Sequence, residues 1–559
     1  MSSWVHPIAR SLLACGAITL LTIAPTQADP ASQQLRDQQQ AQRQREQLQQ
    51  LERLQRLQPI TSHDDRSAFT DTSDNCWSIT GVRLTGNQKL PTHQLQPTVQ
   101  ALSQPCMGIA SINQLLKGLT QQYVEAGYPT SRPYLARPPK HEQPLDIVII
   151  EGFVESIELT DGELPLSLQG AFPGLLGKPL HLPDIEQGLD QLNRLRAYDL
   201  GIELLPGELQ GGTRVVVQPR QVTSPWHLDT RLDNRGSELV GRHRLNLGLG
   251  LDSPLGMNGD LRLSMASTVF NAPGQSRGLN LYYSLPYGPW TFTLNASRMS
   301  YRAPVPESHI VSNGKSRFLG LGAERLLWRN QRGILSASAR VDRKQLITRS
   351  DSTVISLQSP TLATLEAGLN LLWIDRGLWN AYLGVSQGMA WFGADRPLPQ
   401  AQTPRPDFLK YRVNLLHLRQ GPWHWPWRWQ SELTGQYSAD VLPAVEQFQL
   451  SDDSAVRGFR QHTASGASAA VWRNTLSQPL DLAWTHSVQV RPTVGLDLGW
   501  TRFARASASQ RLAGAAAGVE LSLPQSRLRL DYQRALYASD KPAKGLERGY
   551  WVLDWTLTI

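Results

Sequence analysis

From about residue 224 to the end, the chain alternates hydrophobic and polar residues with the two-residue period of a β-strand. Leucine alternates with polar residues or glycine over 244–252, and again over 260–265 after a turn rich in proline, glycine and asparagine. Residues 551–559 repeat the pattern with tryptophan and leucine. A soluble β-sandwich would also bury one face of each strand, so the alternation predicts strands but leaves a sandwich and a membrane barrel open.

A shorter unit with a mixed pattern occupies residues 76–151. Residues 77–84 alternate like a strand, 112–126 carry apolar residues at helical spacing, and 145–150 form a dense β-branched run. Gly127 follows the helical stretch and is expected to end it. The unit therefore has a β-α-β order.

A second unit of the same order follows over residues 152–220. It begins with an alternating strand at 153–159 and closes with two short β-branched strands. Between them, 182–195 has helical spacing, with Asp184 as the expected N-terminal cap. We interpret the two units as an internal repeat of about 70 residues.

The N-terminal residues have the composition of targeting and linking segments. Residues 1–28 contain Arg10, an apolar core and a small-residue cleavage site, which predicts a secretory signal peptide. Residues 29–58 are rich in Gln, Arg, Glu and Leu and predict a polar helix with a thin apolar stripe. Such a helix is either a solvated linker or an insert in a wet cavity, and 59–75 reads as a flexible linker.

Composition bears on the choice between sandwich and barrel. Charged residues make up 18% and the mean hydropathy is −0.33, which is too polar for a helical membrane protein. Apart from the signal peptide, no run of 18 apolar residues predicts a spanning helix. An export signal and tryptophans near strand ends favour an outer-membrane barrel, and about 335 residues at roughly 20 per strand and connection predict about 16 strands. The net charge of +8 is spread along the chain, so no nucleic-acid partner is expected.

Two cysteines remain once the signal peptide is removed, Cys76 and Cys106. An oxidising compartment would pair them, and the closed loop should stabilise the fold by roughly 3–4 kcal/mol. A metal site built on the same two cysteines would lack supporting ligands nearby. We therefore predict a disulfide.

One polar stretch late in the chain stands out, the run Ser454–Arg460 between two strand-like segments. Further on, Gly495, Asp497 and Gly499 fall on one face of a predicted strand, and larger apolar residues fall on the other. Arg457 on the loop thus has a possible carboxylate partner on a wall cleared by glycine. On spacing alone, the favoured reading is an ordinary loop arginine and an ordinary strand acid.

Catalytic motifs are not found. Asn313–Ser316 ends like a phosphate-binding loop, but His309 stands where its first glycine is required, so we interpret Asn313-Gly314 as a hairpin turn. The twelve histidines show no zinc-protease spacing. We expect neither an enzyme nor a cofactor.

The order of these segments resembles the TpsB transporters of two-partner secretion, the haemolysin secretion/activation proteins of Gram-negative outer membranes. The motifs that carry the resemblance are Tyr123–Tyr128 with Glu151-Gly152, then Leu189–Leu195, then Val456–Phe459. It implies a mainly β protein: a C-terminal transmembrane antiparallel β-barrel of about 16 strands, preceded by an N-terminal helix and two α/β POTRA domains.

The resemblance also assigns places and roles. POTRA domains at 76–151 and 152–220 lie in the periplasm, and the barrel at 224–559 carries a pore loop at 446–466. In that loop stand Val456, Arg457, Gly458 and Phe459, and Arg457 pairs with Asp497 on the wall between Gly495 and Gly499. The helix at 29–58 plugs the pore and must leave it during transport.

The implied partner is a secreted, TpsA-like exoprotein that is bound by the POTRA domains. Outer-membrane lipid and the barrel-assembly machinery are further expected partners, and the barrel is expected to be monomeric. Two other functions stay open at this point: a barrel-assembly factor with the same plan, and a passive solute porin.

Overall fold

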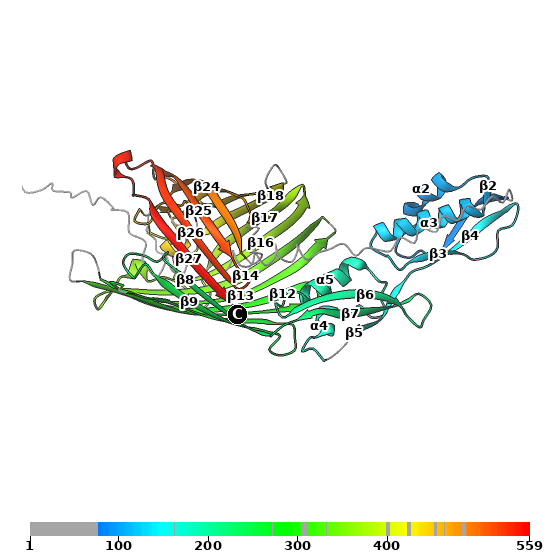
Figure 1. Ribbon diagram of the computed structural model, residues 1–559, viewed down its shortest axis with the longest axis horizontal. Helices are drawn as coiled ribbons and strands as arrows, with labels where there is room; N and C mark the ends of the chain where they lie inside the picture. Colours follow the sequence, from blue (N-terminus) through cyan, green and yellow to red (C-terminus); the bar gives the residue numbers. More distant parts are fainter. Residues whose placement is uncertain are drawn as a thin grey trace, which may run out of the picture.

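A computed structural model describes residues 76–559 apart from 161–162, 271, 305–309, 331, 398–402, 422–425, 452–454, 463 and 482–487. The predicted signal peptide, N-terminal helix and linker fall at 1–75, outside the described residues. The described chain forms a large barrel with two small α/β units at one end (Figure 1). Within this part of the chain, no helix is long and apolar enough to cross a membrane.

The first α/β unit is a four-stranded sheet covered by two helices. Its elements are β1 Cys76–Thr85, α2 Thr92–Leu102, β2 Cys106–Gly108, α3 Ile109–Glu125, β3 Arg132–Leu135 and β4 Gln143–Ile150. The sheet order is β2-β1-β4-β3, with β1 parallel to β4. Leu115, Leu119 and Tyr123 recur along α3 and are fully buried, because this stripe packs on the sheet. Gly127 follows the helix at φ 88°, a conformation that glycine adopts at little cost.

The second α/β unit is a three-stranded sheet of order β5-β7-β6. Its elements are β5 Phe153–Leu159, α4 Leu168–Ala171, α5 Leu182–Leu192, β6 Tyr198–Pro206 and β7 Gly212–Val222. The predicted cap at Asp184 is wrong: the N-cap of α5 is His181, and Asp184 lies in the first turn. A negative charge there is still favourable, because the N-terminal end of a helix carries unpaired N–H groups.

The remaining chain closes into an antiparallel barrel of 16 strands, as the alternating pattern predicted. The strands are β8 Trp226–Asp233, β9 Arg244–Asp252, β10 Asp260–Thr268, β11 Gln275–Tyr287, β12 Trp290–Pro304, β13 Val311–Arg329, β14 Gly333–Ser350, β16 Thr361–Asp375, β17 Gly377–Met389, β18 Leu409–Gly421, β19 Trp427–Ser438, β22 Ser468–Ser477, β24 Gln489–Arg502, β25 Ser509–Ser522, β26 Ser526–Ala538 and β27 Tyr550–Thr558. Short segments accompany them: β15 Thr353–Val354, η1 Ser356–Gln358, η2 Ala444–Glu446, β20 Phe448–Gln449, β21 Ser465–Gly466, β23 Leu480–Asp481 and η3 Ala543–Gly545. β27 pairs with β8, so the sheet has no free edge.

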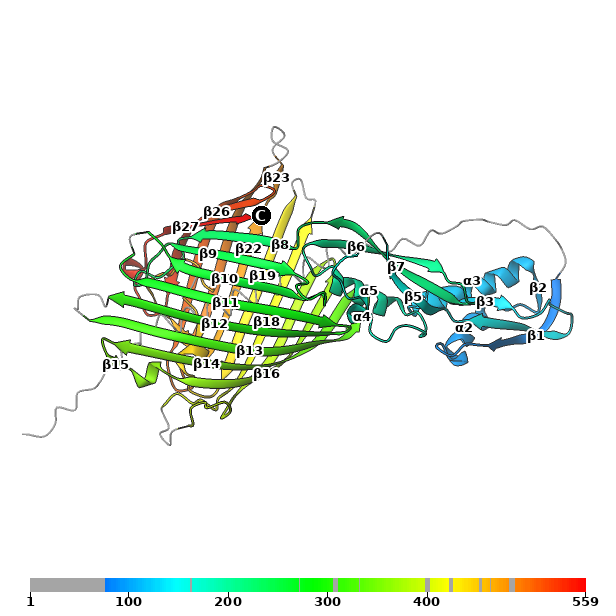
Figure 2. The same cartoon turned by 90° about the horizontal axis from the view of Figure 1, so that it is seen from below.

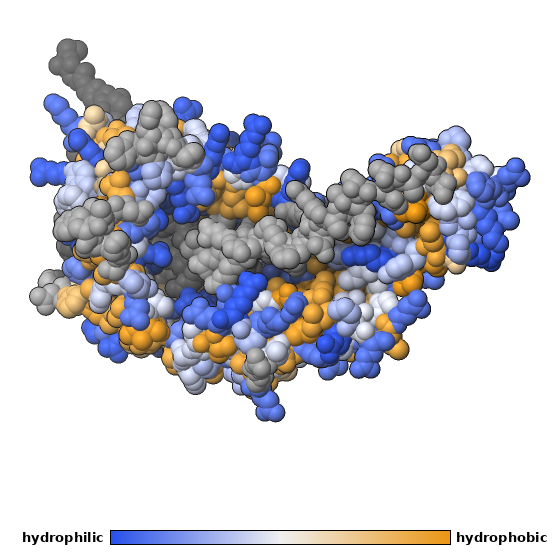
Figure 3. All heavy atoms as spheres, turned by 45° about the vertical axis from the view of Figure 1, so that its right-hand side comes forward, coloured by the Kyte–Doolittle hydropathy of each residue, from blue (hydrophilic) through white to orange (hydrophobic). Residues whose placement is uncertain are grey.

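Alternation decides which side chains face outwards. On β13, Leu319 and Leu321 are 48% and 57% exposed on the outer face. Phe318, which directly precedes Leu319, points to the inside and is buried. Figure 3 shows hydrophobic residues as orange patches on the outside of the barrel. An apolar outer face and a polar inner face are what a barrel in lipid requires.

The predicted hairpin turn at Asn313-Gly314 is wrong. Both residues lie inside β13, which begins at Val311. Gly314 stands opposite Tyr301 of β12, and an added Cβ would overlap the tyrosine ring. The glycine thus makes room for an aromatic side chain in the wall instead of turning the chain.

The second α/β unit docks on one rim of the barrel, where the short turn between β11 and β12 lies (Figure 2). The N–H of Gly288 in this turn donates to the carbonyl of Gly170 (2.8 Å). Asn258 exchanges two hydrogen bonds with the backbone of Ser167, at 2.8 and 2.7 Å. This rim therefore carries the α/β units, and the long connections open at the opposite end.

Candidate functional site

In the connection between β19 and β22, residues 439–467, the described residues fold back into the barrel. The connection contacts β14 and β18 on one part of the barrel wall and β24, β25 and β26 on another. Leu450 and Val456 within it are fully buried. Its described part therefore crosses the lumen. It includes the pore loop predicted at 446–466, and we use that name for the whole connection.

The structure brings Arg457 of the pore loop and Asp497 of β24 together. Arg457 Nε donates to Asp497 Oδ2 and Nη2 donates to Oδ1, each at 2.6 Å, and the Arg457 backbone N–H adds a third bond to Oδ2 at 3.0 Å. Nη2 also donates to the carbonyl of Asn474 on β22 (3.1 Å). The side chains are 3% and 0% exposed. A planar guanidinium that bonds both carboxylate oxygens fixes direction as well as distance.

Glycines clear the wall around this pair. A Cβ at Gly495 would overlap the Arg457 guanidinium, and one at Gly499 would overlap loop side chains. Gly514 of β25, the register partner of Asp497, faces the Arg457 carbonyl in the same way. The sequence reasoning missed Gly514, because it stands in an alanine-rich strand with no acid beside it.

The residues that flank Arg457 also fit the wall closely. Gly458 has φ 94° and lies against the backbone of β26, where a Cβ would collide. Its N–H donates to Gln533 Oε1 of that strand (3.2 Å). Val456 and Phe459, 0% and 3% exposed, pack in an apolar cluster with Leu512 and small residues of the wall. The four residues of the motif thus seat the tip of the loop as a unit.

A second anchor joins the pore loop to the wall at β14 and β18. Glu446 Oε1 accepts from Lys344 Nζ (2.6 Å), and Oε2 accepts from Lys410 Nζ (2.5 Å). All three side chains are at most 8% exposed. The sequence reasoning missed this cluster, because its members come from three distant segments without a common spacing.

A third anchor holds the loop just beyond the arginine motif. The Glu547 carboxylate accepts the backbone N–H groups of Arg460, Gln461 and His462, at 2.8, 3.0 and 2.6 Å. The Arg460 guanidinium lies 4.1 Å from the Tyr550 ring centre, a cation–π contact. The segment between β26 and β27 therefore holds the loop as well.

The motif Tyr123–Tyr128 with Glu151-Gly152 forms contacts that its spacing alone did not show. Tyr123 donates from its hydroxyl to Glu151 Oε1 (3.0 Å), and the N–H of Lys89 donates to the same oxygen (2.6 Å). Burial raises the pKa of the Tyr123 hydroxyl, and the Glu151 carboxylate raises it further, so the hydroxyl remains a donor. This bond links α3 to the end of the sheet.

The motif Leu189–Leu195 faces the barrel rim. Gln191 Nε2 donates to the carbonyl of Gly288 (3.2 Å), and Arg194 Nη2 donates to Ser284 Oγ (2.8 Å). Arg329 at the end of β13 is 3% exposed and forms ion pairs with Asp190 and with Glu186, the latter at 3.3 Å. The helix is therefore held to the barrel by hydrogen bonds and by a buried arginine whose two carboxylate partners are 28% and 14% exposed.

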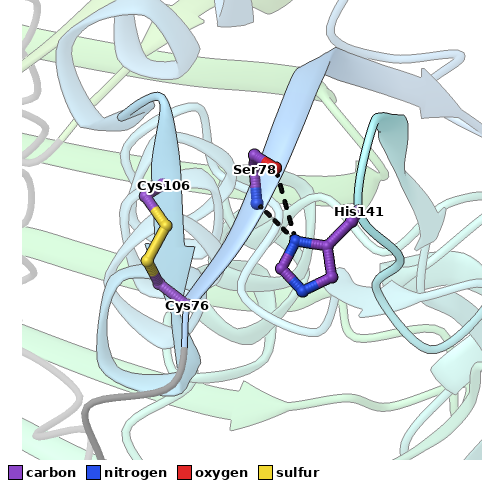
Figure 4. The surroundings of a disulfide bond; sticks show 4 residues. All are labelled: Cys76, Ser78, Cys106 and His141. Carbon is purple, nitrogen blue, oxygen red and sulfur yellow. Dashed lines mark hydrogen bonds between the residues drawn. A yellow bond between two sulfur atoms is a disulfide. The ribbon is translucent and has the colours of Figure 1, made fainter.

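Cys76 and Cys106 form a disulfide at the edge of the first unit, with Cα atoms 5.4 Å apart (Figure 4). β1 and β2 pair directly beside it. On the other side, the N–H of Ser78 donates to His141 Nδ1 (3.3 Å). The disulfide thus ties the short strand β2 to the rest of the sheet.

A closed 16-strand barrel, a loop anchored across its lumen and two α/β units at one rim define an outer-membrane transporter of the two-partner secretion class. The family model of the haemolysin secretion/activation proteins ShlB/FhaC/HecB matches residues 211–521. Models of a ShlB-type POTRA domain and a second POTRA domain match 77–152 and 153–206. The chain belongs to this family, and its POTRA domains lie in the periplasm.

Named relatives agree with this assignment. The chain is 35% identical over 434 residues to hemolysin transporter protein HpmB of Proteus mirabilis and to ShlB of Serratia marcescens, covering 76% of each chain. The structure of CdiB from Escherichia coli superposes with a TM-score of 0.86 at 26% identity, over 96% of this chain and all of that one.

Proposed function

We propose that this transporter carries a haemolysin-type exoprotein from the periplasm to the cell surface. The observation that carries the proposal is the family match over the barrel, together with an anchored loop that crosses the lumen. Relatives at 35% identity that are named hemolysin transporters support this class of cargo. An exoprotein that passes as an extended chain needs a polar lumen, which the inward charged residues provide.

The POTRA sheets offer an entry point for the exoprotein. β2 and β3 are the edges of the first sheet, β3 being the longer, and β5 and β6 are the edges of the second. An edge strand presents unpaired N–H and C=O groups, so an extended segment can add to it by backbone hydrogen bonds. Tyr134 on β3 is 51% exposed and offers an apolar contact next to that edge.

Passage requires the pore loop to give way, because its anchors tie opposite parts of the wall. Arg457–Asp497 and Glu446 with its two lysines hold it in place. The periplasm supplies no ATP, so the free energy of folding outside the cell makes the passage directional. The helix predicted at 29–58 would also have to leave the lumen. The proposal includes a monomeric barrel that the barrel-assembly machinery inserts.

Neither alternative function gains support from the site. A passive porin is disfavoured by the relatives at 35% identity, which are named hemolysin transporters. A barrel-assembly factor shares the general plan, but the matched model over 211–521 is that of the haemolysin secretion/activation proteins.

The test is reconstitution of secretion. A strain that produces the full-length transporter and a haemolysin-type exoprotein encoded beside it should display the exoprotein outside the cell. The same exoprotein without its N-terminal domain should stay in the periplasm, which is the matched control. Retention of the intact exoprotein by a correctly inserted, heat-modifiable barrel would refute the proposal.

A further inference from the structure

The outer wall changes character along β11 to β14. On β13 the exposed Leu321 and Leu319 are followed, on the same face, by the exposed Arg317 and Lys315. β12 likewise passes from Phe292 to charged residues at its far end. These strands lie side by side and extend away from the POTRA end (Figure 2). Cations therefore stand on the outer face directly beyond the apolar surface.

The strand register gathers these cations into one group. Arg298 of β12 stands opposite Arg317 of β13, and Ser300 stands between Arg277 and Lys315 as the register partner of both. One row further out, Asn313 is the partner of both Arg302 and Arg349. Opposite positions in an antiparallel pair bring Cβ atoms to about 5 Å. We call this group the basic face; it consists of Arg277, Arg298, Arg302, Lys315, Arg317 and Arg349.

Within the described part of the chain, the carboxylate nearest to the basic face along the strands is Asp351, which accepts the backbone N–H of Val311. None of its members forms an ion pair with a described residue, and no Asp or Glu occupies an outward position on β11 to β14 beyond Leu319. Like charges directly opposite each other, as Arg298 and Arg317 are, destabilise a sheet. An anion bound between them would remove this cost.

The level of the basic face is that of lipid headgroups. From the outward-facing Arg325, which lies over the Trp290 ring near the rim that carries the POTRA domains, to Arg317, the rise is roughly 26 Å along the strand and, at a tilt of about 40°, roughly 20 Å across the membrane. This approaches the height of about 25 Å that the apolar band of an outer-membrane barrel has. Arg317 therefore stands at the outer boundary of the hydrocarbon layer.

The cations cannot serve the lumen instead. On the inner side of the same strands, Tyr301, Phe318 and Leu346 are at most 4% exposed and pack with Val240 and with Val445 of the pore loop. At this level the inner face of the wall is thus covered by packed apolar side chains. Its charged side chains are left on the surface that faces the membrane.

We propose that the basic face binds the phosphorylated headgroup of an anionic lipid in the outer leaflet, whose acyl chains lie against Leu279, Leu319 and Leu321. Arginine pairs provide the planar donors that bind phosphate at two points. Apolar surface directly below the cations suits a lipid, which carries both chemistries in one molecule, better than a free anion. Bound lipid would brace β11 to β14, the wall against which the pore loop packs.

The test compares lipids on the full-length protein in detergent. Bis-phosphorylated lipid A should bind wild-type protein and raise its melting temperature, whereas dephosphorylated lipid A should do neither. R298Q/K315Q/R317Q should bind bis-phosphorylated lipid A at least tenfold more weakly. R505Q/K541Q/K544Q removes three exposed cations from loops at the same end of the barrel and should bind like wild type.

Further outcomes separate the alternatives. R298K/R317K keeps the charges and should keep most of the binding. High salt should weaken the binding of lipid A to the wild-type protein, a test that requires no variant. Equal binding by the triple glutamine variant, or of the dephosphorylated lipid, would overturn the proposal. Protection of the wild type by inorganic phosphate to the same extent as by lipid A would overturn it too, in favour of a free-anion site.

Discussion

Removal of either partner of the Arg457–Asp497 pair should release the tip of the pore loop. The pair is buried, with side chains 3% and 0% exposed, and loss of one partner of such a pair costs about 3–5 kcal/mol. Each orphan keeps some contacts. Asp497 retains the Arg457 backbone N–H at 3.0 Å and Arg473 at 3.9 Å, and Arg457 retains the Asn474 carbonyl. We therefore expect about 3 kcal/mol for each alanine variant, at the lower end of the range.

The assay is a double-mutant cycle on unfolding free energy, with secretion measured in parallel. The double variant should lose little more than either single one, because all three lose the same contact. Secretion should fall sharply in all three while the barrel still inserts and remains heat-modifiable. Arg511→Ala, which removes an exposed arginine of β25, is the matched control and should behave like wild type. Strictly additive losses, or normal secretion by Arg457→Ala, would refute the reasoning.

Glu446→Gln should leave two buried ammonium groups without their carboxylate and lower the unfolding free energy by about 3 kcal/mol in denaturant titration; an unchanged midpoint would exclude the second anchor. Arg329→Ala should broaden the spin-label distances between α5 and the barrel, whereas Arg220→Ala should not; identical distributions would count against this joint. Cys76→Ser should make the first POTRA domain protease-sensitive, through a loss of about 3–4 kcal/mol, and leave the barrel intact; equal resistance would show that the disulfide is dispensable.

The fold class followed from local patterns, because burial in a barrel has the same two-residue period as the strand itself. Leu319 and Leu321 face lipid for that reason. Asp497 could be placed on the inner face by the same argument, since glycines flank it on alternate positions. The β-α-β order of both POTRA domains was also visible, because each helix carries one apolar stripe.

Errors arose where a residue type has two uses. Asn313-Gly314 has turn chemistry, yet it continues a strand because Tyr301 of the neighbouring strand needs the space. Asp184 has capping chemistry, yet it lies in the first turn of α5. At Asn313-Gly314 the neighbour that decided the outcome belongs to the folded chain, whereas at Asp184 the helix begins earlier than the capping chemistry indicated.

Long-range partners were decided by the tertiary structure alone. Glu446 meets Lys344 and Lys410, and Glu547 meets the backbone of 460–462, because barrel closure brings those segments together. The members of the basic face likewise come from four strands, and only their register makes them one surface. Sequence determines which face of a strand a side chain occupies, through its period. Which side chains become neighbours depends on register and closure, which are set by interactions between segments far apart in the chain.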